Sequence, residues 1–158
     1  MKKRSLAATS AVLLFGLLGP TPGSDAACID LKGEARTNSL GTMMTLGSAQ
    51  LQGNRGLKLR CGVHGVLQGF NAEDGSLHFQ HTIACDDHSV FILDSHTQIK
   101  VENDCQAQGM AGSIASFEET SAMVGVDGPY ADWTGTAWMS GRIDCGWNHM
   151  KITGRICS

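Results

Sequence analysis

The sequence of 158 residues contains 12 basic and 15 acidic residues, which gives a formal net charge of −3 at pH 7. An acidic chain lacks the positive surface that attracts nucleic acid or an anionic membrane surface, so we exclude both as partners. The length fits a single domain, and no stretch after the first 26 residues is long and apolar enough to predict a membrane span.

The N-terminal residues predict a secretory signal peptide. Three basic residues at 2–4 precede an apolar run at 6–18, and small residues lie before an expected cut after Ala26. The apolar run is too short for a membrane-spanning helix. We therefore expect a signal peptide at 1–26, a single domain at 27–158, and a secreted or periplasmic location.

All six cysteines lie in the part of the chain that would be exported. An even number of cysteines in an oxidising compartment predicts three disulfides, each stabilising the fold by roughly 2–4 kcal/mol. Fifteen pairings are open, and the sequence does not choose among them. No Cys-x-x-Cys spacing occurs, so a zinc or thioredoxin-type site is not expected. The six are Cys28, Cys61, Cys85, Cys105, Cys145 and Cys157.

Alternation of apolar and polar residues recurs along the chain after the leader, whereas helical periodicity is nearly absent. Clusters of Gly, Asp and Asn separate the alternating stretches, and Asp74 with Gly75 is expected to form a hairpin turn. The sequence predicts eight strands, at 29–36, 44–52, 57–67, 76–85, 90–98, 110–119, 133–144 and 149–157.

Eight short strands without helices are typical of an up-and-down barrel or of a sandwich. Small residues on one face of the seventh strand favour the barrel, because the interior of a small closed barrel is crowded. That face carries Gly135, Ala137, Met139, Gly141 and Ile143. We predict an all-β, disulfide-stabilised, eight-stranded antiparallel up-and-down β-barrel. Its expected core contains Leu57, Leu59, Val63, Phe79, Ile83, Ile143 and Ile152.

Four stretches, in order along the chain, carry a resemblance to a known family. They are LHFQHTIACDD at 77–87, VGVDGPYA at 124–131, GTA at 135–137 and SGR at 140–142. In this pattern the sequence resembles the bacterial secreted proteins with an allene oxide cyclase-like barrel, a calycin-type barrel shared with plant allene oxide cyclases and dirigent proteins. The resemblance covers roughly residues 57–157 and implies the barrel fold. By analogy it also implies an isomerase or cyclase activity. No motif in the sequence matches the catalytic residues of the cyclases, so the resemblance assigns no catalytic residue.

The sequence gives little support for a metal site or for a catalytic nucleophile. The Gly-x-Ser-x-Gly motif is absent, and each cysteine is expected in a disulfide, so no catalytic nucleophile is predicted. Four histidines fall within 78–96, but residues three apart in a strand point to opposite faces, so His78 and His81 cannot bind one ion. We expect no metal and no cofactor, with a surface zinc or copper site at His88 and the aspartates at 86–87 as the alternative.

His81 is the strongest candidate for a binding residue, because it shares a strand face with Phe79 and Ile83. A histidine among apolar neighbours is either a hydrogen-bonded core residue or a polar group that orients a ligand. Glu118 and Glu119 point to opposite faces of their strand, so one of them faces inward, where a pair with His81 would give an acid/base alternative. The predicted ligand-binding residues are His81, Phe79 and Glu118.

These observations predict a protein that binds a small apolar ligand in the barrel mouth without catalysis. An isomerase or cyclase of the allene oxide cyclase type is one alternative. An extracellular interaction module is the other, using the strand face that bears Trp133, Trp138 and Trp147. The identity of the ligand and the oligomeric state stay open.

Overall fold

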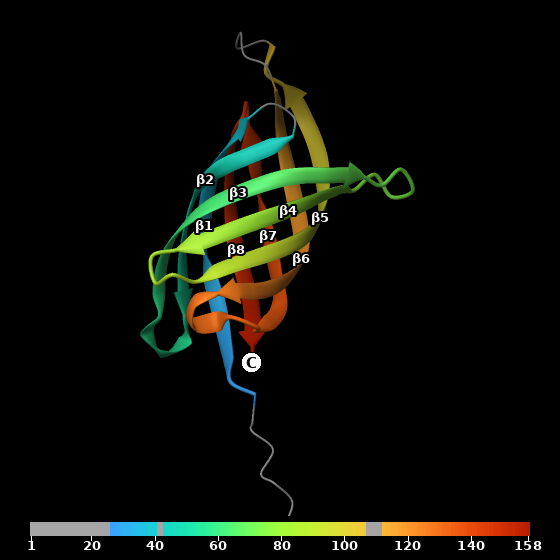
Figure 1. Cartoon of the computed structure of the whole chain (residues 1–158). Helices are drawn as coiled ribbons and strands as arrows, with labels where there is room; N and C mark the ends of the chain where they lie inside the picture. Colours follow the sequence, from blue (N-terminus) through green and yellow to red (C-terminus); the bar gives the residue numbers. More distant parts are fainter. Residues whose placement is uncertain (1–25, 41–42, 107–111) are drawn as a thin grey trace, which may run out of the picture.

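The computed structural model describes residues 26–40, 43–106 and 112–158, so the predicted signal peptide lies, apart from Ala26, outside the described residues. Strands make up most of these ranges (Figure 1). The eight strands are β1 (Cys28–Leu40), β2 (Met44–Gly53), β3 (Lys58–Phe70), β4 (Leu77–Cys85), β5 (Val90–Asp104), β6 (Ser113–Asp127), β7 (Thr134–Asp144) and β8 (Trp147–Cys157). The short 3-10 turns η1 (Asn54–Gly56) and η3 (Gly128–Tyr130) join β2 to β3 and β6 to β7.

Each strand pairs antiparallel with the next, and β8 returns to pair with β1, so the sheet closes into a barrel. The ladder between β1 and β8 runs from Cys28 opposite Cys157 to Asn38 opposite Trp147. Figure 1 shows this closure, with the blue first strand beside the red last strand. The prediction of a closed eight-stranded antiparallel up-and-down barrel is confirmed. No helix within the described ranges is long and apolar enough to cross a membrane.

The strands on either side of the longest hairpin extend beyond their predicted limits. β5 continues to Asp104 instead of ending at 98, and β6 continues to Asp127 instead of ending at 119. The two strands pair along this length, from Val90 opposite Asp127 to Asp104 opposite Ser113. Backbone hydrogen bonds of the ladder do not depend on side-chain polarity, so the polar residues at 102–104 are accommodated as strand.

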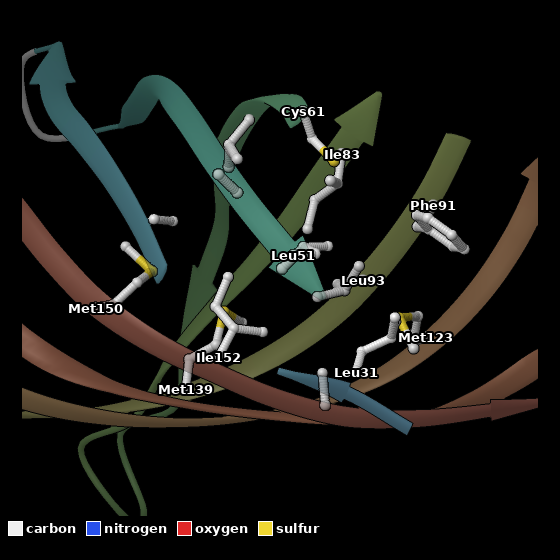
Figure 2. Packing of buried hydrophobic residues seen from close by; sticks show 14 of the residues in the cluster. Leu31, Leu51, Cys61, Ile83, Phe91, Leu93, Met123, Met139, Met150 and Ile152 are labelled. Atoms are coloured by element: carbon white, nitrogen blue, oxygen red, sulfur yellow. The ribbon is translucent and has the colours of Figure 1, made fainter. Parts of the chain in front are cut away.

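Apolar side chains fill one end of the barrel. The start of β1, the end of β8 and the turns η1 and η3 all lie at this end. Phe91 and Leu93 are almost completely buried there, and Tyr130 of η3 stacks on Phe91 with ring centroids 5.9 Å apart. We call this the closed end. Figure 2 shows the buried side chains pointing into the interior, among them Leu31, Leu51, Ile83, Phe91, Leu93, Met123 and Ile152.

The predicted core residues divide into two groups according to their height in the barrel. Leu59, Val63, Ile83 and Ile152 are buried. Leu57, Phe79 and Ile143 are only half-buried. Phe79 and Ile143 are partly exposed because they lie towards the opposite end of the barrel, where side chains do not fill the interior.

The six cysteines form three disulfides, as predicted. Cys28–Cys157 joins the first and last strands, and Cys61–Cys85 joins β3 to β4. Cys105–Cys145 links the connection between β5 and β6 to the turn between β7 and β8, at the end of the barrel opposite the closed end. Three disulfides indicate that the protein folds in an oxidising environment, extracellular or periplasmic.

Candidate ligand site in the barrel mouth

A cavity of about 330 Å³ occupies the interior at the end opposite the closed end. We call it the mouth cavity. Its rim includes Ser39 at the end of β1, Leu77 at the start of β4 and Gly146 in the β7–β8 turn. Apolar atoms make up most of its wall, although eight of the lining side chains are polar and seven are apolar. The polar set consists of Thr37, Ser39, Thr45, His81, Thr97, Ser113, Glu119 and Asn148.

The most buried titratable pair of the mouth cavity joins β4 to β6, with β5 between them. His81 on β4 places Nε2 3.0 Å from Oε1 of Glu119 on β6. The N–H direction of the ring is poorly aligned with the carboxylate, so the contact is an ion pair rather than a well-formed hydrogen bond. Thr97 of the intervening β5 donates its hydroxyl to Oε2 of Glu119 at 2.9 Å. The side chains of His81 and Glu119 are 11% and 5% exposed.

The surroundings of Glu119 favour its ionised form. Burial is the largest influence and raises the pKa of the carboxyl. The contact with His81 and its charge, together with hydrogen bonds from Ser95 and Thr97, outweigh burial, so the pKa of Glu119 lies below its ordinary value. At neutral pH, Glu119 is therefore a carboxylate inside the barrel, where it contacts His81 and Thr97.

The ring of His81 is held in place on two further sides. It stacks on Phe79 with ring centroids 5.7 Å apart and an interplanar angle of 18°. On the β3 side it lies over Gly65, where an added Cβ would come within 2.5 Å of Nδ1 of His81 and within 2.5 Å of Oγ1 of Thr45. Only a residue without a side chain leaves room for both groups. Nε2 therefore contacts Glu119, while Nδ1 of His81 and Oγ1 of Thr45 both lie close against Gly65.

Asn148 of β8 forms a second polar group in the mouth cavity. Its Nδ2 donates to Oγ1 of Thr37 at 3.0 Å and to Oγ of Ser39 at 3.4 Å. Its Oδ1 is buried and has no hydrogen-bond partner among the described residues. Polar contacts thus lie on both the β8–β1 wall and the β4–β6 wall, and apolar side chains such as Met150 and Phe117 lie between them.

A pair of hydroxyls separates the mouth cavity from the packed closed end. Ser95 on β5 and Ser121 on β6 are buried and hydrogen-bonded to each other, with 2.7 Å between their oxygens. Towards the closed end, the inward positions next to them on the same strands are Leu93 and Met123, both buried. The interior therefore changes from apolar and filled to polar and hollow along the barrel axis.

The predicted site residues are placed as follows. His81 and Phe79 line the mouth cavity, as expected. Glu118 does not, because its side chain is exposed on the outer surface, so its assignment to the interior is wrong. Glu119 is the inward residue, since β6 buries Phe117, Glu119, Ser121 and Met123 in alternation.

Sequence reasoning missed Thr45, Thr97 and Asn148. A signal for Asn148 was present, because it shares the inward phase of β8 with Met150 and Ile152. Thr97 likewise follows the phase of Leu93 on β5. The sequence gives no comparable signal that Thr45 faces inward. Along β2 small residues alternate with polar ones, so the inward and outward positions are hard to tell apart.

The remaining histidines of the 78–96 segment lie outside the mouth cavity. His78 forms an ion pair with Asp94 on the outer wall and stacks on His96 with ring centroids 5.2 Å apart. His78 and His81 thus point to opposite faces, as predicted. Within the described residues, no group of His, Cys, Asp or Glu side chains is arranged to hold a metal ion, and this includes the turn at His88.

The three tryptophans do not share one surface. Trp133 is half-buried and packs edge-on against Tyr130 at the closed end, with ring centroids 5.4 Å apart. Trp138 is exposed on the outer wall of β7, and Trp147 is exposed at the start of β8, near the mouth cavity. The aromatic face that an interaction module would use is therefore divided among three regions.

Comparisons with known proteins identify no family for this chain. No protein-family model matches the sequence, and no match is found among curated proteins. The resemblance to the allene oxide cyclase-like proteins therefore stays a prediction, which depends on the four sequence stretches and on the barrel that they imply.

Proposed function

We propose that the protein is a secreted or periplasmic binding protein that takes up a small, mostly apolar ligand in the mouth cavity without changing it chemically. The observation that carries the proposal is the difference between the two ends of the interior. The closed end is filled by apolar side chains, whereas the other end holds a cavity with a buried ion pair in its wall.

The size and lining of the mouth cavity support binding. Ligand pockets measure roughly 300–1,000 Å³ and are mostly apolar, with a few polar groups that fix orientation. The mouth cavity, at about 330 Å³, lies at the lower end of this range. Wider depressions occur on the outer wall, but these are more open and are lined by exposed side chains such as Lys100 and Gln50.

The ion pair also supports a role in recognition. A buried ion pair is a poor device for stability, because replacing it with well-packed apolar side chains is often neutral or stabilising. A carboxylate and an imidazole inside a small barrel are therefore better explained by what they contact in the cavity. The predicted signal peptide and the three disulfides support action outside the cytoplasm.

Naphthalene tests the proposal, because it is apolar and has no polar group that would require a particular partner. We expect calorimetry to show one naphthalene bound per barrel. Ile99 of β5 lines the mouth cavity, so Ile99→Trp should fill the cavity and abolish this binding. Gln98 is the neighbouring residue on the outer face, and Gln98→Trp is the matched control that should leave binding unchanged.

Two outcomes would contradict the proposal. One is the absence of naphthalene binding by the correctly disulfide-bonded protein. The other is equal binding by the Ile99→Trp and Gln98→Trp variants, which would place the ligand outside the mouth cavity. Native mass spectrometry of protein from its own host adds a separate check, because release of a chemically converted ligand would favour the isomerase alternative.

A further inference from the structure

We infer that the end of β5 beside the mouth cavity binds a basic, extended segment of another protein, which adds to the sheet as a further strand. This site is distinct from the mouth cavity, so the inference does not depend on the proposed ligand. It follows from the register of β5 with its neighbours, from an exposed valine on the unpaired part of β5, and from the charges around that part.

The register leaves one end of β5 without a partner on one side. β4 begins at Leu77, so its ladder with β5 ends at Leu77 opposite Thr97, and Figure 1 shows β5 continuing beyond the start of β4. On its other side, β5 stays paired with β6 as far as Asp104 opposite Ser113. Among the described residues, no strand pairs with 99–104 on the β4 side, and we call this segment the free edge. An unpaired edge presents backbone N–H and C=O groups to which a further strand can bind.

The free edge is held extended by the sheet behind it. β6 pairs in turn with β7 as far as Ile114 opposite Asp144. The Cys105–Cys145 disulfide fixes the residue that follows the free edge to the β7–β8 turn. A two-stranded ribbon alone is only marginally stable, whereas this edge belongs to a sheet of several strands. Binding a peptide to an edge that is already ordered has a smaller entropic cost.

An exposed valine shows where a side chain of the partner would pack. Ile99 and Val101 lie two residues apart on the same face of β5, and Ile99 lines the mouth cavity. Val101 is 64% exposed, although it lies opposite the fully buried Ala115 of β6. On the β4 side it lacks the cross-strand neighbour that the earlier inward residues of β5 have. An apolar side chain on an added strand would supply that neighbour.

The charges around the free edge favour a basic partner. Glu102 and Asp104 belong to the free edge, and Asp74 lies beside its start, where its carbonyl oxygen accepts from Nε2 of Gln98 at 3.4 Å. Arg142 of β7 forms an ion pair with Glu102, whereas Asp74 and Asp104 have no ion pair among the described residues. A basic segment is therefore attracted. A second copy of this chain, with a formal net charge of −3, is repelled.

Two features of the free edge restrict which chains can pair with it. Lys100 is its basic residue, and the register shifts between Val101 and Asn103, which marks a β-bulge. Proteins use charged side chains and bulges on edge strands to prevent indiscriminate pairing. The free edge therefore selects a segment in which apolar residues, facing Ile99 and Val101, alternate with basic ones.

Synthetic octapeptides at pH 7 test the inference. We expect a peptide of alternating lysine and valine to bind and to slow amide hydrogen exchange within 99–104, because new backbone hydrogen bonds protect these amides. A peptide of alternating glutamate and valine should bind at least about 10-fold more weakly, because like charges repel. A peptide of alternating lysine and proline keeps the charge but cannot pair as a strand, so it should also bind at least about 10-fold more weakly.

Lysine substitutions of two exposed valines test where the peptide binds. Val101→Lys places a positive charge on the free edge and removes the apolar contact, so it should weaken binding of the lysine–valine peptide at least about 5-fold. Val126→Lys is the matched control, because Val126 is a 52% exposed valine at the opposite end of β6. Both variants change the net charge equally, and Val126→Lys should leave binding nearly unchanged. If Val101→Lys does not fold, the hydrogen exchange of the wild-type protein still locates the peptide.

Four outcomes would overturn the inference. The first is equal binding of the lysine–valine and glutamate–valine peptides, and the second is equal binding of the lysine–valine and lysine–proline peptides. The third is unchanged hydrogen exchange within 99–104, or equal weakening by Val101→Lys and Val126→Lys. The fourth is a dimer in sedimentation that Val101→Lys dissociates, which would make a second copy of this chain the occupant. Naphthalene binding should be the same in Val101→Lys and wild type, so failure of this inference leaves the proposed function intact.

Discussion

Glu119 illustrates how a single inward-facing residue changes the chemistry of the barrel interior. Its neighbours along the inner face of β6 are Phe117 and Ser121, and its Oε1 lies 3.0 Å from Nε2 of His81 on β4. A carboxylate at this depth needs polar partners, which are the His81 ring on β4 and the Thr97 hydroxyl on β5. The acidic side chain next to it in sequence, Glu118, points into solvent and meets none of these conditions.

The lowered pKa of Glu119 predicts a pH-dependent stability. A carboxyl whose pKa is lower in the folded state than its ordinary value of 4.5 contributes stability fully above that value. The contribution is lost as the pH falls through the folded pKa. Glu119→Gln should therefore lower the free energy of unfolding by about 1–3 kcal/mol at pH 7, since a charged hydrogen-bonding group is removed.

Guanidinium unfolding with intact disulfides, at pH 7 and at about pH 3, measures this effect. The difference between the wild-type protein and Glu119→Gln should shrink at the lower pH, because the stabilisation by an ionised Glu119 decreases as the pH falls below the ordinary pKa of 4.5. Glu118→Gln is the control, because substitutions of exposed residues usually change stability by less than about 0.5 kcal/mol. A difference that stays constant with pH would show that Glu119 is not ionised in the folded barrel.

At the scale of strands and turns, the three disulfides stabilise connections of different length. The bonded cysteines are separated by 24 residues for Cys61–Cys85, 40 for Cys105–Cys145 and 129 for Cys28–Cys157. A crosslink restricts the unfolded chain more strongly when it closes a longer loop. The disulfide between the first and last strands should therefore contribute most, although both of its strands are already paired in the ladder.

Paired Cys→Ala substitutions test this order. Chain entropy predicts losses of about 3.5 kcal/mol for Cys61–Cys85, about 4 kcal/mol for Cys105–Cys145 and about 5 kcal/mol for Cys28–Cys157. Guanidinium midpoints of the three double variants, measured at the same pH, should fall in that sequence. If Cys61→Ala/Cys85→Ala is the least stable variant, local strain or packing around that bond decides the stability rather than loop length.

The sequence predicted the strands well and the site only in part, for reasons that differ between elements. Period-two alternation identified all eight strands, because one face of each is buried in the barrel. The limits of β5 and β6 were wrong because strand pairing, which is not visible in one segment, extends them through polar residues. The phase of β6 was uncertain for Glu118 and Glu119 because the predicted strand ended before Ser121 and Met123, which show that phase.

Closure positions the mouth cavity at the scale of the whole molecule. His81, Thr97 and Glu119 come from three consecutive strands, and Thr45 and Asn148 come from β2 and β8. Only a closed sheet brings these five strands around one interior space. The sequence alone could place His81 and Phe79 on the same face of a strand, but it could not show which groups lie across the cavity, because that depends on pairing between strands distant in sequence.

The pairing of β1 with β8 has a further consequence for how the chain can be connected. The backbone N–H of Ser158 donates to the carbonyl of Ala27 at 3.0 Å, and the backbone N–H of Ala27 donates to Oγ of Ser158 at 3.0 Å. A short linker from 158 to 27 would therefore join the ends without distorting either strand. New termini can then be placed in the exposed turn at 71–75, which lies outside the strands.

Such a circular permutant should fold into the same barrel and bind naphthalene with unchanged affinity, as circular dichroism and calorimetry would show. A permutant that stays unfolded would mean that the native strand order is needed to start folding. In the closed ring of strands, no strand is structurally first or last. The cavity therefore depends only on which strands are neighbours.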